Sequence, residues 1–151
     1  MWIHTLDKEK CLKILLDNRL AYIACAHMDA PYVVPIYYAY FNYSIYCFSI
    51  PGKKIEIMRT NPLVSLLIEA KGQGKAWQTV IVTGRYEELP DQVGHNTERG
   101  QAWSLLSKYG YWWEPGALKP TPLHANKSNI LFRISIDHIS GREAKMEMSV
   151  A

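Results

Sequence analysis

The apolar residues of this chain gather in six short stretches that are rich in β-branched and aromatic side chains. Stretches of this kind, bounded by turn-forming residues, indicate strands rather than helices. The predicted strands cover residues 20–26, 32–41, 44–49, 64–68, 77–89 and 130–139. Helical patterns separate only some of them, which does not fit the regular alternation of a doubly wound parallel sheet. We therefore expect a mostly β fold, a six-stranded barrel with peripheral helices.

Three further segments carry apolar residues at helical spacing. Their defining residues are Leu12, Leu15 and Leu16 in the first, Lys53–Thr60 in the second, and Ala102, Leu105, Leu106 and Tyr109 in the third. We expect Thr5 to cap the first helix. Asn61 ends the second, because a residue before proline is pushed out of the α region. Gly110 is the expected stop of the third helix.

Two residues interrupt the predicted strands. Pro35 lies inside the second strand and cannot donate a ladder hydrogen bond, so it indicates an edge, a bulge or a ligand-facing break. Gly84 marks a candidate bulge in the fifth strand. The polar segment 90–100 is expected to form a loop or a broken helix, and the polar tail after Arg142 is expected to fray.

Composition narrows the functional classes. The length of 151 residues suits a single domain spanning residues 1–151. A net charge of +3 is too weak and dispersed for a nucleic-acid-binding face, but it suits binding of a small anion. Three cysteines without a CxxC pair, and five scattered histidines, predict neither a disulfide framework nor a metal site. With no signal peptide and no bilayer-spanning run, we expect a cytoplasmic protein without a membrane segment.

The segment from Ser49 to Lys54 is the best local candidate for chemistry. A strand end, a glycine turn and a helix start follow one another here, and together they present free N–H groups and a positive dipole to an anion. Lys53 and Lys54 add two charges, and Ser49 adds a hydroxyl donor. These features are typical of a phosphate site. The alternative is a solvated lysine pair at the start of a helix.

A second candidate is Thr79, in the strand that starts at Trp77. Alternation puts Thr79, Ile81 and Thr83 on one face of that strand. From there the Thr79 hydroxyl is within reach of a phosphate or a ring edge. The alternative is a β-branched residue that simply suits a strand.

Several segments follow one another at intervals that fit one flavoprotein family. They are residues 32–38, 45–49, 52–54, 61–64, 77–84, 112–116, 132–136 and 139–142. In order and spacing they resemble the pyridoxamine 5′-phosphate oxidase-like FMN-binding proteins, and within these the nitroimidazole-resistance branch. The resemblance spans residues 5–142 and depends on no single motif.

The resemblance implies a six-stranded split β-barrel that works as a homodimer, with FMN in each of two clefts between the subunits. It implies that Lys53 and Lys54 grip the FMN phosphate. Backbone groups of residues 35–37 line the flavin ring, which suits a strand broken by proline. Ser49 and Thr79 then contact the phosphate or the ring. The cofactor-binding residues that the resemblance implies are Pro35, Ile36, Tyr37, Ser49, Lys53, Lys54, Thr79 and Trp113.

Three departures from the family separate this chain from its better-known members. Where the nitroimidazole-resistance branch often has a histidine, this chain has Phe48. Tyr32 stands near the phosphate-binding arginine of the true oxidases. The arginine and histidine group that binds pyridoxal phosphate in those oxidases is not evident. Vitamin B6 synthesis is therefore not the expected activity.

The resulting hypothesis is an FMN-dependent oxidoreductase, similar to a nitroreductase, that acts on a small, planar molecule with NAD(P)H as a candidate donor. No side chain need act as acid or base, because the flavin carries the electrons. The alternative is a non-catalytic flavin- or ligand-binding module. A third hypothesis, single-stranded nucleic-acid binding through exposed aromatics, conflicts with the modest charge. The 10 Tyr and 5 Trp also suit a dimer interface.

Overall fold

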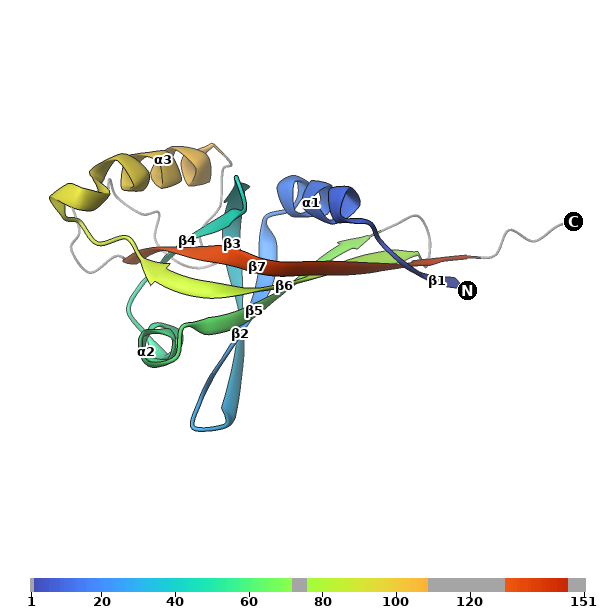
Figure 1. The fold of residues 1–151 in the computed structure, drawn as a ribbon, viewed down its shortest axis with the longest axis horizontal. Helices are drawn as coiled ribbons and strands as arrows, with labels where there is room; N and C mark the ends of the chain where they lie inside the picture. Colours follow the sequence, from blue (N-terminus) through green and yellow to red (C-terminus); the bar gives the residue numbers. More distant parts are fainter. Residues whose placement is uncertain (1, 72–75, 109–129, 147–151) are drawn as a thin grey trace, which may run out of the picture.

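Among the described residues, 2–71, 76–108 and 130–146 of a computed structural model, seven antiparallel strands form one sheet that curls into a ring (Figure 1). The strands are β1 (Trp2–Thr5), β2 (Leu20–His27), β3 (Ala30–Phe41), β4 (Ser44–Ser49), β5 (Leu63–Lys71), β6 (Trp77–Glu88) and β7 (Ile130–Lys145). Their order is β1-β7-β4-β3-β2-β5-β6, and β7 also pairs with β6. Six strands thus close the ring, which confirms the predicted barrel. The short strand β1 was not predicted.

The helices flank this ring on two sides. Within the described part of the chain they are α1 (Lys8–Asp17), α2 (Lys53–Thr60), the 3-10 turn η1 (Val93–His95) and α3 (Asn96–Ser107). Figure 1 shows α1 and α3 on one side of the β6–β7 ribbon and α2 on the other. The broken-helix interpretation of residues 90–100 is confirmed, whereas Tyr109 and Gly110 lie outside the described residues. No helix described here has the length and apolarity to cross a membrane.

The prediction that Thr5 caps the first helix is wrong. Thr5 ends β1, where it pairs with Arg142 of β7. The cap is Asp7, whose carboxylate accepts a hydrogen bond from the Lys10 amide at 2.9 Å. An aspartate at this position also places negative charge at the positive end of the helix dipole.

β7 is longer than predicted because three strands pair with it. β4 pairs with Ile130–Ser135, β6 with Phe132–Ala144 and β1 with Arg142–Lys145. The predicted frayed tail is therefore strand as far as Lys145, since β1 and β6 satisfy both of its edges. Local polarity could not reveal this, because the partners come from the opposite end of the chain and from its middle.

A bulge lies at Gly84 as expected, but the extra residue belongs to the partner strand β7 and not to the strand that contains Gly84. Thr83 pairs with His138 but Gly84 pairs with Ile136, so β7 contributes one extra residue to the ladder. A Cβ atom at Gly84 would lie 2.3 Å from the Ser135 carbonyl oxygen. Glycine is thus required where the two backbones approach most closely.

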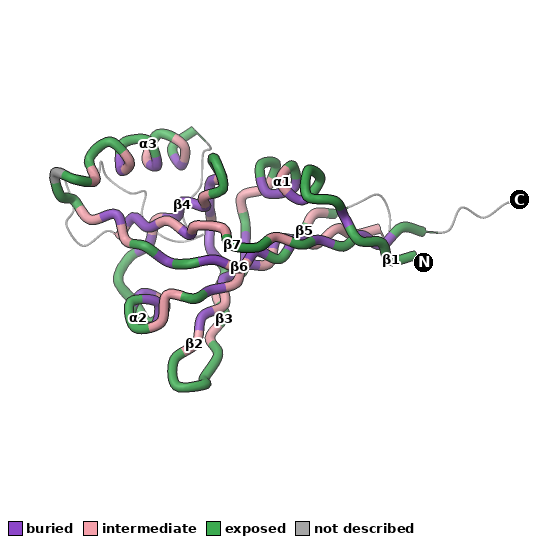
Figure 2. The backbone as a smooth tube through the Cα atoms, in the orientation of Figure 1, coloured by how far each residue is buried: buried purple, intermediate pink, exposed green. Residues whose placement is uncertain are grey.

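Two clusters of buried apolar side chains form the core. Figure 2 shows the buried positions along the strands and on the helices. The larger fills the ring, where Tyr38 is fully buried and donates its hydroxyl proton to the Leu15 carbonyl at 2.7 Å. The smaller lies under α3 and includes Tyr46 and Leu106. Arg133 of β7 pairs with carboxylates of both β6 and α3, which fixes α3 to the barrel.

Candidate functional site

The start of α2 offers uncapped backbone donors. Ser49 ends β4, Gly52 is the N-cap residue of α2, and Lys53 and Lys54 begin its first turn. No side chain caps this helix, and nothing lies within 4 Å of the position that a Cβ atom of Gly52 would take. Ser49 is buried and its hydroxyl donates to the Ile50 carbonyl at 2.8 Å. The first-turn N–H groups therefore lack a side-chain acceptor next to open space, which suits an anion.

Lys53 connects α2 to the beginning of β3. Its ammonium nitrogen lies 4.9 Å from the centre of the Tyr32 ring. This cation–π contact places the start of β3 beside the start of α2. The tyrosine that replaces the family's arginine thus holds a cation near the same position.

Lys54 faces different neighbours. Burial raises the pKa of Cys25 and, strongly, that of Cys47, and the positive charge of Lys54 opposes the shift at both thiols. Its ammonium group therefore lies near buried positions of β2 and β4. All three cysteines are free and buried.

An unpaired backbone edge follows from Pro35. The Tyr38 amide donates to Arg19 on the β2 side at 2.8 Å, and β4 pairs with β3 only from Tyr38 onward. Because N–H groups alternate between the two edges of a strand, Pro35 and Tyr37 direct their backbone groups away from β2. There, no strand among the described residues pairs with them. The expected edge at Pro35 is confirmed.

Ile36 differs from its two neighbours. Its side chain is 4% exposed and lies in the core, and its backbone faces Ala21 of β2. Of the predicted flavin-lining segment, only the backbones of Pro35 and Tyr37 reach the free edge.

Thr79 lies elsewhere in the same chain. It pairs with Glu69 on one side and with Arg142 on the other, and it lines a pocket of about 940 Å³. Arg142 also pairs with β1, and Figure 1 places β1 and α2 toward opposite ends of the long axis. The structure therefore separates Thr79 from Lys53 and Lys54. Trp113 lies outside the described residues.

Two functional candidates were missed as such by the sequence analysis. Tyr32 was noted only as a departure from the family, and Arg142 only as part of a terminal motif. Only the tertiary structure reveals them. Tyr32 is identified by the contact of its ring with Lys53, and Arg142 by its pairing with Thr79 in the β6–β7 ladder. Among the described residues no group of three or more His, Cys, Asp or Glu side chains is placed to hold a metal ion.

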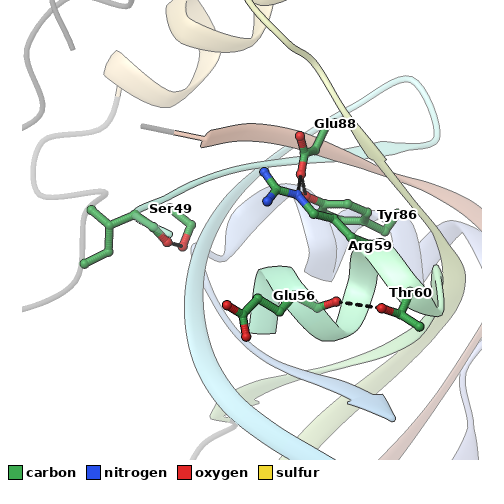
Figure 3. A network of polar contacts seen from close by, with 7 residues as sticks. Ser49, Glu56, Arg59, Thr60, Tyr86 and Glu88 are labelled. Atoms are coloured by element: carbon green, nitrogen blue, oxygen red, sulfur yellow. Dashed lines mark hydrogen bonds and ion pairs between the residues drawn. The ribbon is translucent and has the colours of Figure 1, made fainter. Parts of the chain in front are cut away.

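A polar network fixes the other end of α2 (Figure 3). Glu88 of β6 pairs with Arg59 in the last turn of α2 and accepts a hydrogen bond from the Tyr86 hydroxyl at 2.7 Å. Burial opposes the charge on Glu88, but the hydrogen bonds from Arg59 and Tyr86 outweigh it and lower its pKa. Burial, reinforced by Glu88, raises the pKa of Tyr86, so Tyr86 remains a neutral donor. The direction of α2, and hence of its lysines, depends on this network.

The ring of six strands closed by β6 and β7, with a free edge beside an uncapped helix, defines the protein as a split barrel. A family model described as pyridoxamine 5′-phosphate oxidase matches residues 7–143. The chain belongs to this family, which confirms the resemblance found in the sequence.

Relatives support this assignment. An uncharacterized protein of Rhizobium meliloti (strain 1021) is 44% identical over 146 residues, which cover 95% of this chain and 97% of that protein. The crystal structure of a FAD-binding protein from Mesorhizobium loti is 52% identical with a TM-score of 0.83, and the match covers 96% and 100% of the two chains. A 5-nitroimidazole antibiotic resistance protein from Bacteroides thetaiotaomicron shares the fold, with a TM-score of 0.70 at 19% identity over 95% and 89% of the chains.

The network at Glu88 predicts a pH-dependent stability. Because the folded-state pKa of Glu88 is lowered, its contribution is complete above its ordinary pKa of 4.5 and is lost as the pH falls through the folded-state value. We expect Glu88→Gln to lower the free energy of unfolding at pH 7 by about 1 kcal/mol, a value limited by solvent screening of the half-exposed Arg59. Urea denaturation from pH 7 to pH 3 should show this deficit shrinking below pH 4.5. Asp91→Asn, at an exposed carboxylate, is the control, and a deficit that persists at pH 3 would contradict the assignment.

Proposed function

We propose that this protein binds FMN in a cleft shared by two copies of the chain and reduces a small molecule. The observation that carries the proposal is the uncapped start of α2, with Lys53 and Lys54, beside the free edge of β3 at Pro35 and Tyr37. A phosphate fits the first element and a flat ring fits the second. The Mesorhizobium loti relative, described as a FAD-binding protein, supports a flavin as the ligand.

The donor set fits a flavin in two respects. The phosphate would accept hydrogen bonds from the first-turn N–H groups of α2, and Lys53 and Lys54 would balance its charge, which also relieves two cations at the positive end of a helix. The free edge of β3 offers the Tyr37 N–H as a donor and the Pro35 carbonyl as an acceptor. The polar edge of a flavin ring alternates acceptors and donors in the same way.

The bound flavin would supply hydride and electron transfer, while the protein supplies orientation and charge. The described side chains around α2 and β4 suit that division of labour. Glu88 and Tyr86 are held by their mutual hydrogen bond and by Arg59. Phe48, where the nitroimidazole-resistance branch often has a histidine, packs edge-on against Trp103 of α3 with ring centres 6.2 Å apart. Phe48 therefore packs against α3, and its phenyl ring has no proton to transfer.

A shared cleft reconciles the separated site residues. Thr79 and the two lysines lie toward opposite ends of one chain, so one small cofactor contacts both only if two copies meet. The outer face of the sheet offers a surface for this. Cross-strand pairing aligns Pro35, Tyr22, Leu67 and Ile81 in one apolar row, in which Tyr22 is 37% and Ile81 48% exposed. Burying such a row favours a homodimer.

The function itself is tested by spectroscopy followed by turnover. The protein purified with added FMN should show the absorption bands of oxidised flavin, and NAD(P)H should bleach them. A quinone or nitroaromatic acceptor should then restore the bands over repeated cycles. Bound flavin that neither donor reduces would favour the non-catalytic binding module, and absence of flavin binding would contradict the proposal.

The lysine pair should determine cofactor affinity. Lys53→Ala/Lys54→Ala removes two charge-assisted contacts, each worth about 1.5–3 kcal/mol, so FMN affinity should fall by about 100-fold or more. Quenching of flavin fluorescence measures the dissociation constant. Lys8→Ala/Lys10→Ala is the matched control, because it removes two charges from the start of α1 and should leave FMN affinity unchanged. Equal affinity in both double variants would rule out the assigned phosphate site.

The apolar row should determine assembly. Tyr22→Arg places a charge in its centre, so the dimer should dissociate to monomers and FMN affinity should fall with it, because the cleft needs both copies. Light scattering measures the mass and fluorescence quenching the affinity. Leu16→Arg, at an exposed position of α1 on another surface, should leave both unchanged. A monomeric wild-type protein that binds FMN would refute the shared cleft.

A further inference from the structure

We infer that the pocket around Thr79 binds a small planar carboxylate and thereby defines the substrate class. The pocket has a volume of about 940 Å³ and is lined by residues of β1, β5, β6 and β7. Its role as a substrate site rests on the proposed function, because Thr79 is the residue that brings the pocket to the flavin. The binding preference itself is independent of the flavin.

The ladder arranges the lining residues in two adjacent rows on the outer face of the sheet. In the first row Thr79 lies between Glu69 of β5 and Arg142 of β7. In the second row Trp77 lies opposite Lys71 of β5. Directly paired residues have Cβ atoms about 5 Å apart, so these side chains border one small space.

Charge in this space is positive and unpaired. Glu69 and Arg142 flank Thr79 on neighbouring strands, and the structure records no ion pair between them. Within the described residues no ion pair is formed by Arg142 or by Lys71. Two cations against one carboxylate leave the pocket with a net positive charge, so an anion is the complementary ligand.

The planar shape of the Arg142 guanidinium favours a carboxylate over other anions. The guanidinium of Arg142 presents a planar fork that matches a carboxylate with two parallel hydrogen bonds. The indole of Trp77 offers a flat surface for stacking, and Ile81 adds an apolar wall. The hydroxyls of Thr79 and Ser140 provide further polar contacts at the pocket wall. A flat ring that bears a carboxylate satisfies all of these groups together.

Gln78 also lines the pocket. Its amide donates to the Glu143 carboxylate at 3.1 Å, and Glu143 also pairs with Lys145 at 3.4 Å. This carboxylate is 8% exposed and its charge is already matched. It therefore does not compete with a ligand for Arg142.

A matched pair of probes tests the inference. Isothermal titration of 4-nitrobenzoate and the neutral 4-nitrobenzamide measures binding to the wild-type protein, with and without FMN. We expect the carboxylate to bind about tenfold more tightly or better, the effect of one charge-assisted bidentate contact. Arg142→Gln should abolish this preference and leave FMN affinity within twofold. Arg85→Gln, which removes an exposed arginine from the same face of β6, should preserve it.

Each contrary outcome identifies a different failure. Equal affinity of the wild-type protein for the two probes would overturn the inference without the need for any variant. A large loss of FMN affinity in Arg142→Gln would also overturn it, because the guanidinium would then hold the cofactor's phosphate. Failure of the wild-type protein to bind FMN would refute the proposed function alone, since the probe preference is also measured without flavin.

Discussion

The ladder between β6 and β7 is the interaction on which the rest of the structure depends. It runs from Trp77 paired with Ala144 to Glu88 paired with Phe132, and it turns an open sheet into a ring. Closure removes two long edges that would otherwise expose unpaired backbone groups. It also fixes Glu88, and through Arg59 the direction of α2. The position of the lysines that we assign to the cofactor thus follows from a strand pairing that contains neither of them.

Closure is incomplete at β3, and this is where the candidate site lies. β4 covers the edge of β3 only from Tyr38 to Phe41. The earlier part of the strand keeps free backbone groups, and Tyr32 brings Lys53 to its beginning. This part of β3 lacks ladder hydrogen bonds on one side. Its free backbone groups form a flat polar edge next to the start of α2, where a ligand can bind. The outer-face pocket at Arg142 lies toward the other end of the molecule, so the cleft that we propose would combine both sets of groups only between two copies of the chain.

Sequence patterns predicted the elements whose signals are local. The strands at 20–26 and 44–49, the helix that begins at Lys53, and the breaks at Pro35 and Gly84 all follow from residues within one segment. The patterns missed β1, whose side chains are exposed and whose only reason to be a strand is its pairing with β7. The contact of Lys53 with Tyr32 and the neighbours of Thr79 were equally hidden, because they arise from register between distant segments. The candidate site residues therefore stay a prediction, and the sequence could name them one by one but could not group them in space.

Pro35 also protects the molecule while the edge is open. A bare strand edge is a template on which another chain can add its own strand, and such growth leads to aggregates. Proline lacks the donor that a continuous intermolecular ladder needs, so an incoming strand would lose a hydrogen bond in the middle of the exposed segment. A small ligand needs only one or two of the remaining groups and is not hindered. The same residue thus leaves the edge accessible to the cofactor that we propose and closed to β-sheet polymerisation.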